Sequence, residues 1–165
     1  LLKYELVNAA DFKIPQERLR VIIVGIRSDL HVEYFFPSPS SAKPITLHRA
    51  IGDLPTNPHP YYKEKVVPDE GNVLNHDYYT GPYDKKFMAR NRVRSWDELS
   101  FTIQAQAKNE PLHPQAPKMV YVSQEERRFE TGKEPLYRRL SVRECARIQT
   151  FPEKFKFASS DILDG

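Results

Sequence analysis

The residues best suited to chemistry in this sequence are basic, and they are concentrated in one short segment. No acidic residue interrupts positions 85–94, where five basic residues occur: Lys85, Lys86, Arg90, Arg92 and Arg94. The stretch 127–147 is also rich in arginine. Local positive charge of this kind attracts the phosphate backbone of a nucleic acid, although a solvated surface is an equally common reason for such a run. The formal net charge of +3 is too small to decide between the two.

Candidates for a nucleophile or a metal site are few. Cys145 is the only cysteine, so no internal disulfide and no thiolate zinc cluster can form, and a reducing, cytoplasmic setting fits. The histidines lack the paired spacing of metal ligands: His31, His48, His59, His76 and His113. No apolar run approaches the roughly 20 residues that span a bilayer, and the amino terminus lacks the pattern of a secretory signal. We therefore expect no metal and no membrane.

Two strands are expected near the amino terminus. Residues 1–7 have the pattern of a strand, and residues 20–27 contain a continuous β-branched run, which is typical of a strand buried on both faces. Two strands need a larger sheet to cover them, and no later run of this kind supplies it. Because the chain also begins abruptly, without methionine, we expect residues 1–35 to be the end of a truncated sheet whose other strands lie in an absent amino-terminal domain.

Beyond this sheet the chain is predicted to be irregular, because it has 14 prolines against 6 glycines. Residues 36–46, rich in Pro and Ser, are the expected linker. Residues 55–82 are predicted to be irregular, and strands are predicted at 101–105 and 119–122.

Two short helices are predicted. One covers residues 47–54 and is ended by Pro55. The other begins at Ser141, which with Glu144 has the spacing of a capping box, and stops before Phe151. The predicted fold class is therefore α+β, with few helices and short strands in a loop-rich domain over residues 47–165.

Two blocks of the sequence resemble the eighth and ninth motif blocks of DNA cytosine-5 methyltransferases. The first consists of Asn8–Phe12, Pro15–Arg20 and Val24–Gly25, and the second of Arg138–Gln149 with Phe151–Pro152. They occur in the family's order, about 120 residues apart, so the resemblance covers essentially the whole chain. Residues 1–35 are then expected to be the end of the family's catalytic-domain sheet.

The resemblance implies roles for three residues of the eighth block. In this family a cysteine thiolate attacks carbon 6 of a flipped cytosine, and a guanidinium beside the ring stabilises the charge that develops. Arg20 is expected to contact the target base, Arg18 to brace the catalytic glutamate of the missing domain, and Gln16 to orient the pair. The plain alternative is that all three merely flank the solvated end of a strand.

The residues between the two blocks are where this family keeps its target recognition domain. Residues 87–96, 101–105 and 112–117 resemble the branch that recognises GGCC. Because arginine pairs bidentately with guanine O6 and N7, Arg90 and Arg92, two apart in an extended segment, are expected to contact guanines. Arg94 is expected to contact the DNA backbone, and Thr102 belongs to the same DNA-binding set. Phosphate contact is the alternative for both guanine-reading arginines.

The sequence departs from the GGCC branch at a few positions. Lys108 stands where these enzymes commonly carry arginine, so it is expected to read a base with poorer discrimination. Lys13 and Thr150 occupy positions that are often glycine. Cys145 lacks the Pro-Cys-Gln context and is not expected to be the nucleophile. Four residues of the ninth block are expected to organise the domain rather than touch substrate: Arg139, Arg143, Glu144 and Arg147.

Several parts that this chemistry needs are missing from the sequence: the glycine-containing methyl-donor loop, the Pro-Cys pair, the Glu-Asn-Val segment and the tenth block. We therefore expect part of a DNA cytosine-5 methyltransferase of a restriction-modification system, inactive alone and binding no S-adenosylmethionine alone. Its expected partners are double-stranded DNA and a missing catalytic domain or subunit, and an excised segment is the simplest account. The alternatives are a DNA-binding specificity subunit of a split methyltransferase and a tRNA cytosine-5 methyltransferase relative.

Overall fold

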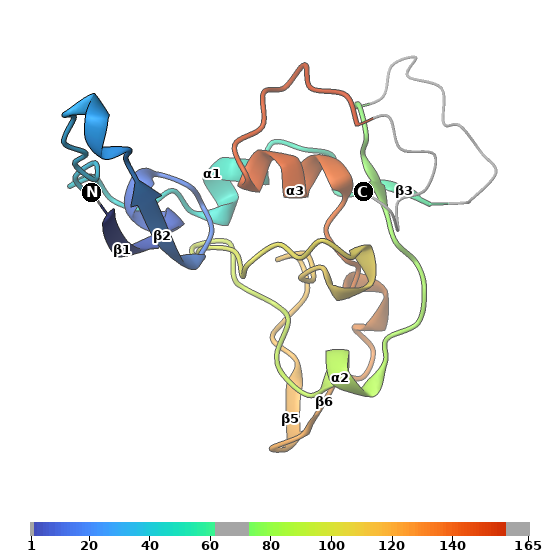
Figure 1. Cartoon of the computed structure of the whole chain (residues 1–165). Coiled ribbons are helices and arrows are strands. Elements are labelled where there is room, and N and C mark those ends of the chain that lie inside the picture. The colour runs from blue at the N-terminus through green and yellow to red at the C-terminus, as the bar shows by residue number, and fades with distance from the viewer. Residues whose placement is uncertain (1, 62–72, 158–165) are drawn as a thin grey trace.

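The computed structural model describes residues 2–61 and 73–157, and the predicted domain 47–165 includes two stretches outside these residues, 62–72 and 158–165. Within residues 2–61 and 73–157, three short α-helices and three two-stranded sheets are joined by long irregular segments (Figure 1). The α+β, loop-rich fold class is confirmed. Four 3-10 helices also occur among the described residues: Ala9–Phe12, Ser28–Leu30, Ala107–Asn109 and Glu134–Leu136.

The first two strands form an antiparallel hairpin at one end of the molecule, drawn in dark blue in Figure 1. Strand β1 is Leu2–Asn8 and strand β2 is Leu19–Gly25, so both predicted strands are present. Within the described residues the faces of this hairpin are open: Ile23 of β2 is 65% exposed and Tyr4 of β1 is 74% exposed. The burial expected for β2 depends on strands of the absent domain and stays a prediction. Two strands cannot cover each other's faces, and none of the described residues forms a third strand beside them.

The first hydrophobic cluster lies where helix α1, Leu47–Ile51, packs against helix α3, Val142–Ile148. Its buried members are Leu47, Ile51, Leu54, Ile103, Leu140, Cys145 and Ile148. Helix α1 ends earlier than its pattern predicted, with Gly52 as the carboxyl cap, and Leu54 joins the cluster from the following turn. This cluster fixes α3, and with it the ninth block, against the middle of the chain.

The second hydrophobic cluster lies under helix α2, Lys85–Met88. Its buried members are Phe87, Val93, Leu112, Ala116, Met119 and Tyr137. From this cluster the hairpin of β5, Val120–Ser123, and β6, Glu126–Arg128, projects at the bottom of Figure 1. Strand β5 confirms the strand predicted at 119–122, with its start moved by one residue.

The chain between the clusters carries little regular structure. Strands β3, His59–Pro60, and β4, Asp77–Tyr78, form a two-residue parallel pair. The strand predicted at 101–105 is wrong: the segment has no strand partner, apart from one bridge between Ser100 and Gln16 just before it. The linker predicted at 36–46 has neither helix nor strand.

Both ends of helix α3 follow local sequence rules. At its start Ser141 accepts a hydrogen bond from the amide of Glu144, and the Glu144 carboxylate accepts one from the amide of Ser141, which confirms the capping box. At its end the amide of Phe151 donates to the Ala146 carbonyl and that of Thr150 to the Arg147 carbonyl, both at 2.9 Å. These two bonds form a Schellman motif, which places Thr150 at the position that usually requires glycine.

Thr150→Gly should therefore raise the free energy of unfolding by about 1 kcal/mol. Thr150 has a φ of 62°, in the left-handed region that a β-branched residue enters at a steric cost of roughly 1 to 2 kcal/mol. Glycine removes this cost but adds roughly 0.5 to 1 kcal/mol of chain entropy to the unfolded state, so the net gain is small. Urea unfolding measures it, with Thr46→Gly at an extended position as the control that should destabilise. A loss of stability in Thr150→Gly would contradict the strain argument.

Lys13 shows the same geometry at the end of its 3-10 helix, with a φ of 64°. The two positions that the family often fills with glycine are thus both in the left-handed region, and this backbone requirement explains the glycines without any functional role.

Candidate nucleic-acid interface

The eighth-block segment is joined backbone to backbone with residues 100–110 of the predicted target recognition domain, which we call the recognition segment. The amide of Glu17 donates to the Ser100 carbonyl at 2.9 Å, and the amide of Ser100 donates to the Pro15 carbonyl at 3.0 Å. The hydroxyl of Thr102 donates to the Glu17 carbonyl at 2.7 Å. Segments about 85 residues apart in the sequence therefore lie side by side, which the sequence alone could not show.

Gln16 and Arg18 hold this junction from inside. Gln16 is 1% exposed, and its side-chain oxygen accepts from the amide of Ile103 at 3.2 Å and from the Arg18 guanidinium at 3.5 Å. Arg18 also donates to the Ile103 carbonyl at 3.1 Å. Gln16 thus contacts Arg18, one of the two arginines that it is predicted to orient, and the orienting role itself stays a prediction. Both side chains also fix the recognition segment.

Arg20 lies further along, on strand β2, and its side chain is exposed. The contact that the structure describes for its guanidinium is with the neighbouring Leu19 carbonyl, at 2.7 Å. Its charge is therefore available at the surface, two residues beyond the junction that Arg18 makes.

Arg94 ties the basic segment to the eighth block through charge. Its guanidinium donates to the carboxylate of Glu17 and, at 3.2 Å, to that of Glu98, and it lies 4.2 Å from the ring centre of Phe101. Hydrogen bonds from Ser95 lower the pKa of Glu98 to about 2, so this partner is ionised at neutral pH. Contact of Arg94 with the DNA backbone stays a prediction, and a phosphate there would compete with two carboxylates.

Arg90 and Arg92 line the same cavity, of about 160 Å³, which we call the arginine pocket. Arg92 forms its inner wall: the residue is 9% exposed, and its guanidinium donates to the carbonyls of Phe87, at 3.0 Å, and Lys86, at 3.3 Å. Arg92 therefore satisfies the last turn of α2, as basic residues near helix ends do. Arg90 is exposed, and its guanidinium makes no comparable hydrogen bond to another described residue.

The other walls of the arginine pocket come from the recognition segment. Thr102, Gln104 and Asn109 line it. Lys108, the predicted replacement for a base-reading arginine, is exposed on the 3-10 helix next to Asn109, and its carbonyl accepts from Arg139 at 3.1 Å. Of the predicted DNA-binding residues, Arg90, Arg92 and Thr102 thus line the arginine pocket, whereas Lys108 is the sequence neighbour of its lining residue Asn109 and Arg94 lies at the junction with the eighth block.

The ninth block forms a buried ionic network around Glu144, which is 0% exposed. Arg138 donates to both of its carboxylate oxygens, at 2.8 Å each, and the Ser141 amide donates at 2.7 Å. Burial alone would raise the pKa of Glu144, but the hydrogen bonds and charge of Arg138 outweigh it, so this pKa lies below its usual range. Glu144 is therefore charged at neutral pH and fully paired.

The other arginines of the ninth block bind backbone from distant segments. Arg139 donates to the carbonyls of four residues: Tyr79, Gly81, Pro82 and Lys108. Arg143 donates to the carbonyls of Leu74 and Phe155, both at 2.8 Å. Arg147 pairs with Asp53 and Glu153. These contacts, with those of Glu144, fit the organising role predicted for the four residues, because Arg139 and Arg143 hold mostly irregular chain in place and Arg147 joins the turn after α1 to the chain after α3.

Sequence reasoning missed four buried polar residues that belong to these networks: His76, Glu110, His113 and Arg138. Of these four, only Arg138 could have been predicted from the sequence. A capping-box glutamate that becomes buried needs a nearby cation, and Arg138 precedes Glu144 in the same block. His76 joins Ser141 and the Pro55 carbonyl, both at 2.8 Å. The Pro55 carbonyl can only accept, so Nε2 carries a proton. Burial lowers the pKa of His76, so at neutral pH the ring is neutral and Nδ1 accepts from the Ser141 hydroxyl.

His113 and Cys145 have no catalytic geometry. Burial lowers the pKa of His113 to about 4, so the ring is neutral at pH 7. Burial likewise raises the pKa of the Cys145 thiol well above its usual value, which disfavours the reactive thiolate. Within residues 2–61 and 73–157 no group of three His, Cys, Asp or Glu side chains could hold a metal ion. No helix in the same residues is long and apolar enough to cross a membrane.

Comparison with known proteins gives a consistent result. The profile of the family described as C-5 cytosine-specific DNA methylase matches residues 1–163. Type II methyltransferase M.MthTI of Methanothermobacter thermautotrophicus is 48% identical over 164 residues, which cover 99% of this chain and 49% of that protein. Type II methyltransferase M.FnuDI of Fusobacterium nucleatum is also 48% identical, over 98% of this chain and 48% of that protein.

A more distant relative extends the pattern. Type II methyltransferase M.BsuRI of Bacillus subtilis is 42% identical over 95% of this chain and 33% of its own length. The chain thus spans about half the length, or less, of these curated relatives.

Proposed function

The chain belongs to the C-5 cytosine-specific DNA methylase family, and from this premise we propose that it supplies the DNA-recognition part of a DNA cytosine-5 methyltransferase. The parent enzyme would transfer a methyl group from S-adenosylmethionine to carbon 5 of a flipped cytosine. The observation that carries the proposal is the junction between the segments of Arg20 and Thr102, because it joins a predicted base-contacting arginine to the arginine pocket.

In this proposal the arginine pocket reads the sequence and Arg20 faces the extruded cytosine. Arg90 is the guanine-contacting residue, since its guanidinium is exposed at the pocket and can present a planar fork to guanine O6 and N7. Arg92 then acts mainly by holding the last turn of α2 and so the position of Arg90. The site is short and GC-rich, and GGCC is the first sequence to test.

The exposed hairpin β1–β2 is proposed as the contact with the rest of the enzyme. Leu6, Val21 and Ile23 are each more than 60% exposed, which is unusual for neighbouring large apolar side chains of a sheet. The two 48% identical relatives are about twice as long as this chain, so they contain enough additional residues to form a sheet around such a hairpin. The missing catalytic domain or subunit is therefore the proposed occupant.

The described residues do not fit the methyl donor itself. Each α-helix follows an irregular segment with Thr46, Asp84 or Ser141 as its amino-terminal cap, and none begins after a strand and a glycine-rich loop. Cys145 is buried with an inert thiol. We therefore assign S-adenosylmethionine binding and the nucleophile to the rest of the parent enzyme and derive no step of methyl transfer here.

Arg90→Ala should weaken binding to a GGCC duplex by roughly 10- to 100-fold, because a bidentate guanine contact is worth about 1 to 3 kcal/mol. Binding to a scrambled duplex should change by less than about threefold. Fluorescence anisotropy at several salt concentrations measures both affinities. Arg49→Ala is the matched control, because Arg49 is an exposed arginine on α1, outside the arginine pocket. Equal losses on both duplexes would reassign Arg90 to phosphate contact.

The same assay separates the alternatives. A competition between duplex DNA and tRNA tests the RNA-directed relative, and tighter binding of tRNA would overturn the DNA proposal. Tight, specific DNA binding without any partner would favour the second alternative, a specificity subunit of a split methyltransferase.

A further inference from the structure

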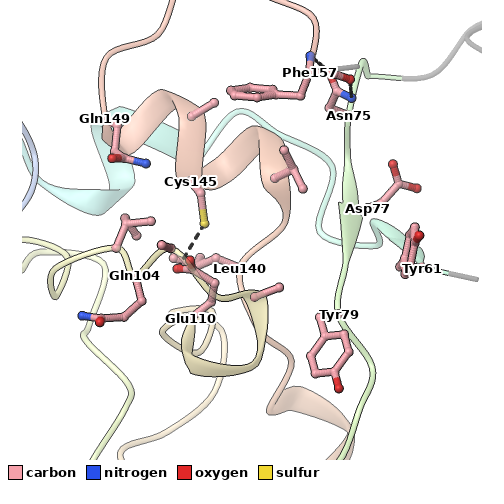
Figure 2. A pocket seen from close by; sticks show the side chains of 15 residues that line it. Tyr61, Asn75, Asp77, Tyr79, Gln104, Glu110, Leu140, Cys145, Gln149 and Phe157 are labelled. Atoms are coloured by element: carbon pink, nitrogen blue, oxygen red, sulfur yellow. Dashed lines mark hydrogen bonds between the residues drawn. The ribbon is translucent and has the colours of Figure 1, made fainter. Parts of the chain in front are cut away.

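A second cavity has one lining residue, Gln104, in common with the arginine pocket. Figure 2 shows it between helix α3, the segment around Gln104 and Glu110, and the chain that carries Asn75 and Tyr79. Its volume is about 190 Å³. Since a dry cavity of about 150 Å³ is large enough for benzene, this space can hold a six-membered ring.

The walls of this cavity are mostly apolar and well fixed. Ile103, Leu140 and Ala146 line it. Asn75, at the edge of the cavity, is held by the backbone of Phe157. Its side chain donates a hydrogen bond to the Phe157 carbonyl and accepts one from the Phe157 amide, both at 3.1 Å. The cavity therefore has a defined shape that favours a flat, largely apolar molecule.

Several polar side chains line the cavity, among them Asp77, Gln104 and Gln149, and the buried one is the carboxyl of Glu110, which is 7% exposed. Burial raises the pKa of Glu110 to about 8, so the group is a neutral carboxylic acid at pH 7. Its partners in the structure are the Cys145 thiol, with Sγ 3.5 Å from Oε2, and the backbone amide of Gln104. The Gln104 amide can only donate, and the thiol is a weak donor and a weak acceptor, so among the described residues the acid's own O–H has no acceptor stronger than the sulfur at 3.5 Å.

A neutral carboxylic acid presents one donor and one acceptor side by side. The molecules that match it have an adjacent acceptor and donor on one edge, as the pairing edges of cytosine and guanine do. A mainly apolar slot with a few polar groups is the usual form of a site for a small flat ligand, in which the walls hold the ring and the polar groups set its orientation.

We propose that the cavity at Glu110 binds a nucleobase, with the ring between the apolar walls and its pairing edge on the Glu110 carboxyl. The proposal rests on the proposed function for the source of the base. Gln104 lines both this cavity and the arginine pocket, so the cavity adjoins the predicted DNA surface. The base is either that of an unpaired nucleotide in bound DNA or a free base, and the two sources share the same chemistry.

The first test uses the whole chain with free cytosine and free guanine as probes, followed by NMR titration. Glu110→Gln keeps one donor and one acceptor and should bind the preferred base within about threefold of the wild type. Glu110→Leu puts an apolar side chain of similar size in place of the carboxyl. Both hydrogen bonds to the base are lost, and this variant should bind the base at least about tenfold more weakly. Benzene serves as the probe without a pairing edge, and its binding should not depend on residue 110.

A pH series sharpens this comparison. The charged or titratable groups around Glu110 and its cavity are Cys145 on α3, Arg139 before it, and three residues of the cavity wall: Tyr61, Asp77 and Tyr79. Cys145 and Arg139 keep their charge between pH 6 and 9, because the thiol pKa is well above its usual value and arginine stays protonated. The wall residues are the same in Glu110→Gln, so a difference between the two proteins reports on Glu110. Base binding by the wild type should therefore fall between pH 7 and 9 as Glu110 loses its proton, whereas Glu110→Gln should bind equally across this range.

The second arm places 2-aminopurine at each position of a GGCC duplex. An increase in its fluorescence on binding, lost in Glu110→Leu but kept in Glu110→Gln, would assign the base to DNA. Binding of free bases without this change would support the site and assign it to a free base. If Glu110→Leu binds cytosine and guanine as well as the wild type does and leaves the 2-aminopurine signal unchanged, the proposal is overturned. Arg90-dependent duplex binding in the same variant would show that the proposed function survives this failure.

Discussion

Replacement of Glu144 by alanine should lower the free energy of unfolding by about 3 to 5 kcal/mol, enough to leave the chain largely unfolded at 37 °C. The carboxylate is fully buried between the Arg138 guanidinium and the Ser141 amide. Its removal leaves Arg138 as an uncompensated buried charge and also removes half of the capping box of α3. Urea unfolding followed by circular dichroism measures the loss.

Two comparisons make this prediction specific. Arg147→Ala removes ion pairs with Asp53 and Glu153, whose side chains are more than 60% exposed, and should cost only about 0 to 1 kcal/mol. The double variant Arg138→Met with Glu144→Gln removes both charges together and should recover part of the stability lost in Glu144→Ala. A double variant no more stable than Glu144→Ala would show that the loss does not come from an unpaired charge.

The pH dependence of the Glu144 contribution has a definite sign. Because the pKa of Glu144 is lower in the folded chain than the usual 4.5, its stabilisation is fully present above pH 4.5. The stabilisation is lost as pH falls through the folded pKa. The stability difference between the wild type and Glu144→Ala should therefore be constant near pH 6 and shrink in acid.

Glu110→Gln should have the opposite effect and stabilise the chain at alkaline pH, by about 3 to 5 kcal/mol at pH 9. The pKa of Glu110 is raised from 4.5 to about 8 by burial, so between these values the folded chain binds a proton that the unfolded chain has released. The free energy of unfolding of the wild type therefore falls as pH rises from 4.5 to 8. Glutamine carries no titrating group and shows no such fall.

Thermal and urea unfolding of both proteins between pH 4 and 9 measure this difference. At pH 4 the two proteins should be similarly stable, and they should diverge above pH 5. Glu98→Gln is the control of opposite sign, because hydrogen bonds from Ser95 lower the pKa of that partly exposed carboxylate to about 2, so its removal should destabilise at neutral pH. Parallel pH profiles for the wild type and Glu110→Gln would mean that Glu110 is ionised in the folded chain at neutral pH.

The local elements were predictable because short-range rules govern them. The Ser141–Glu144 spacing predicted the start of α3, since both capping bonds form within one turn. Residues 47–51 and 120–122 formed the predicted helix and strand, because their apolar patterns match the period of each element. The strand predicted at 101–105 failed because extended backbone becomes a strand only when a partner is present, and the segment is held instead by Gln16 and Thr102 side chains.

The sequence identified the arginines of the basic run as a group but could not predict which of them is exposed and which is buried or paired. Arg90 and Arg92 are alike in the sequence, two positions apart in one basic run, yet one is exposed at the arginine pocket and the other caps α2 from inside. Arg94 is paired by two carboxylates, one of which comes from the eighth block. Which arginine has a free guanidinium depends on the acceptors that the fold brings to it, and these lie up to 77 residues away.

The sequence by itself determined the family, the α+β class, the absence of a Pro-Cys pair and the ends of α3, because motif order and hydrogen bonds between near neighbours are properties of the linear chain. Only the tertiary structure decided that the eighth block lies against the recognition segment, that Arg92 is buried and that Glu110 lines a cavity. These features depend on burial and on contacts between distant segments, and burial is also what turns an ordinary glutamate into a neutral acid.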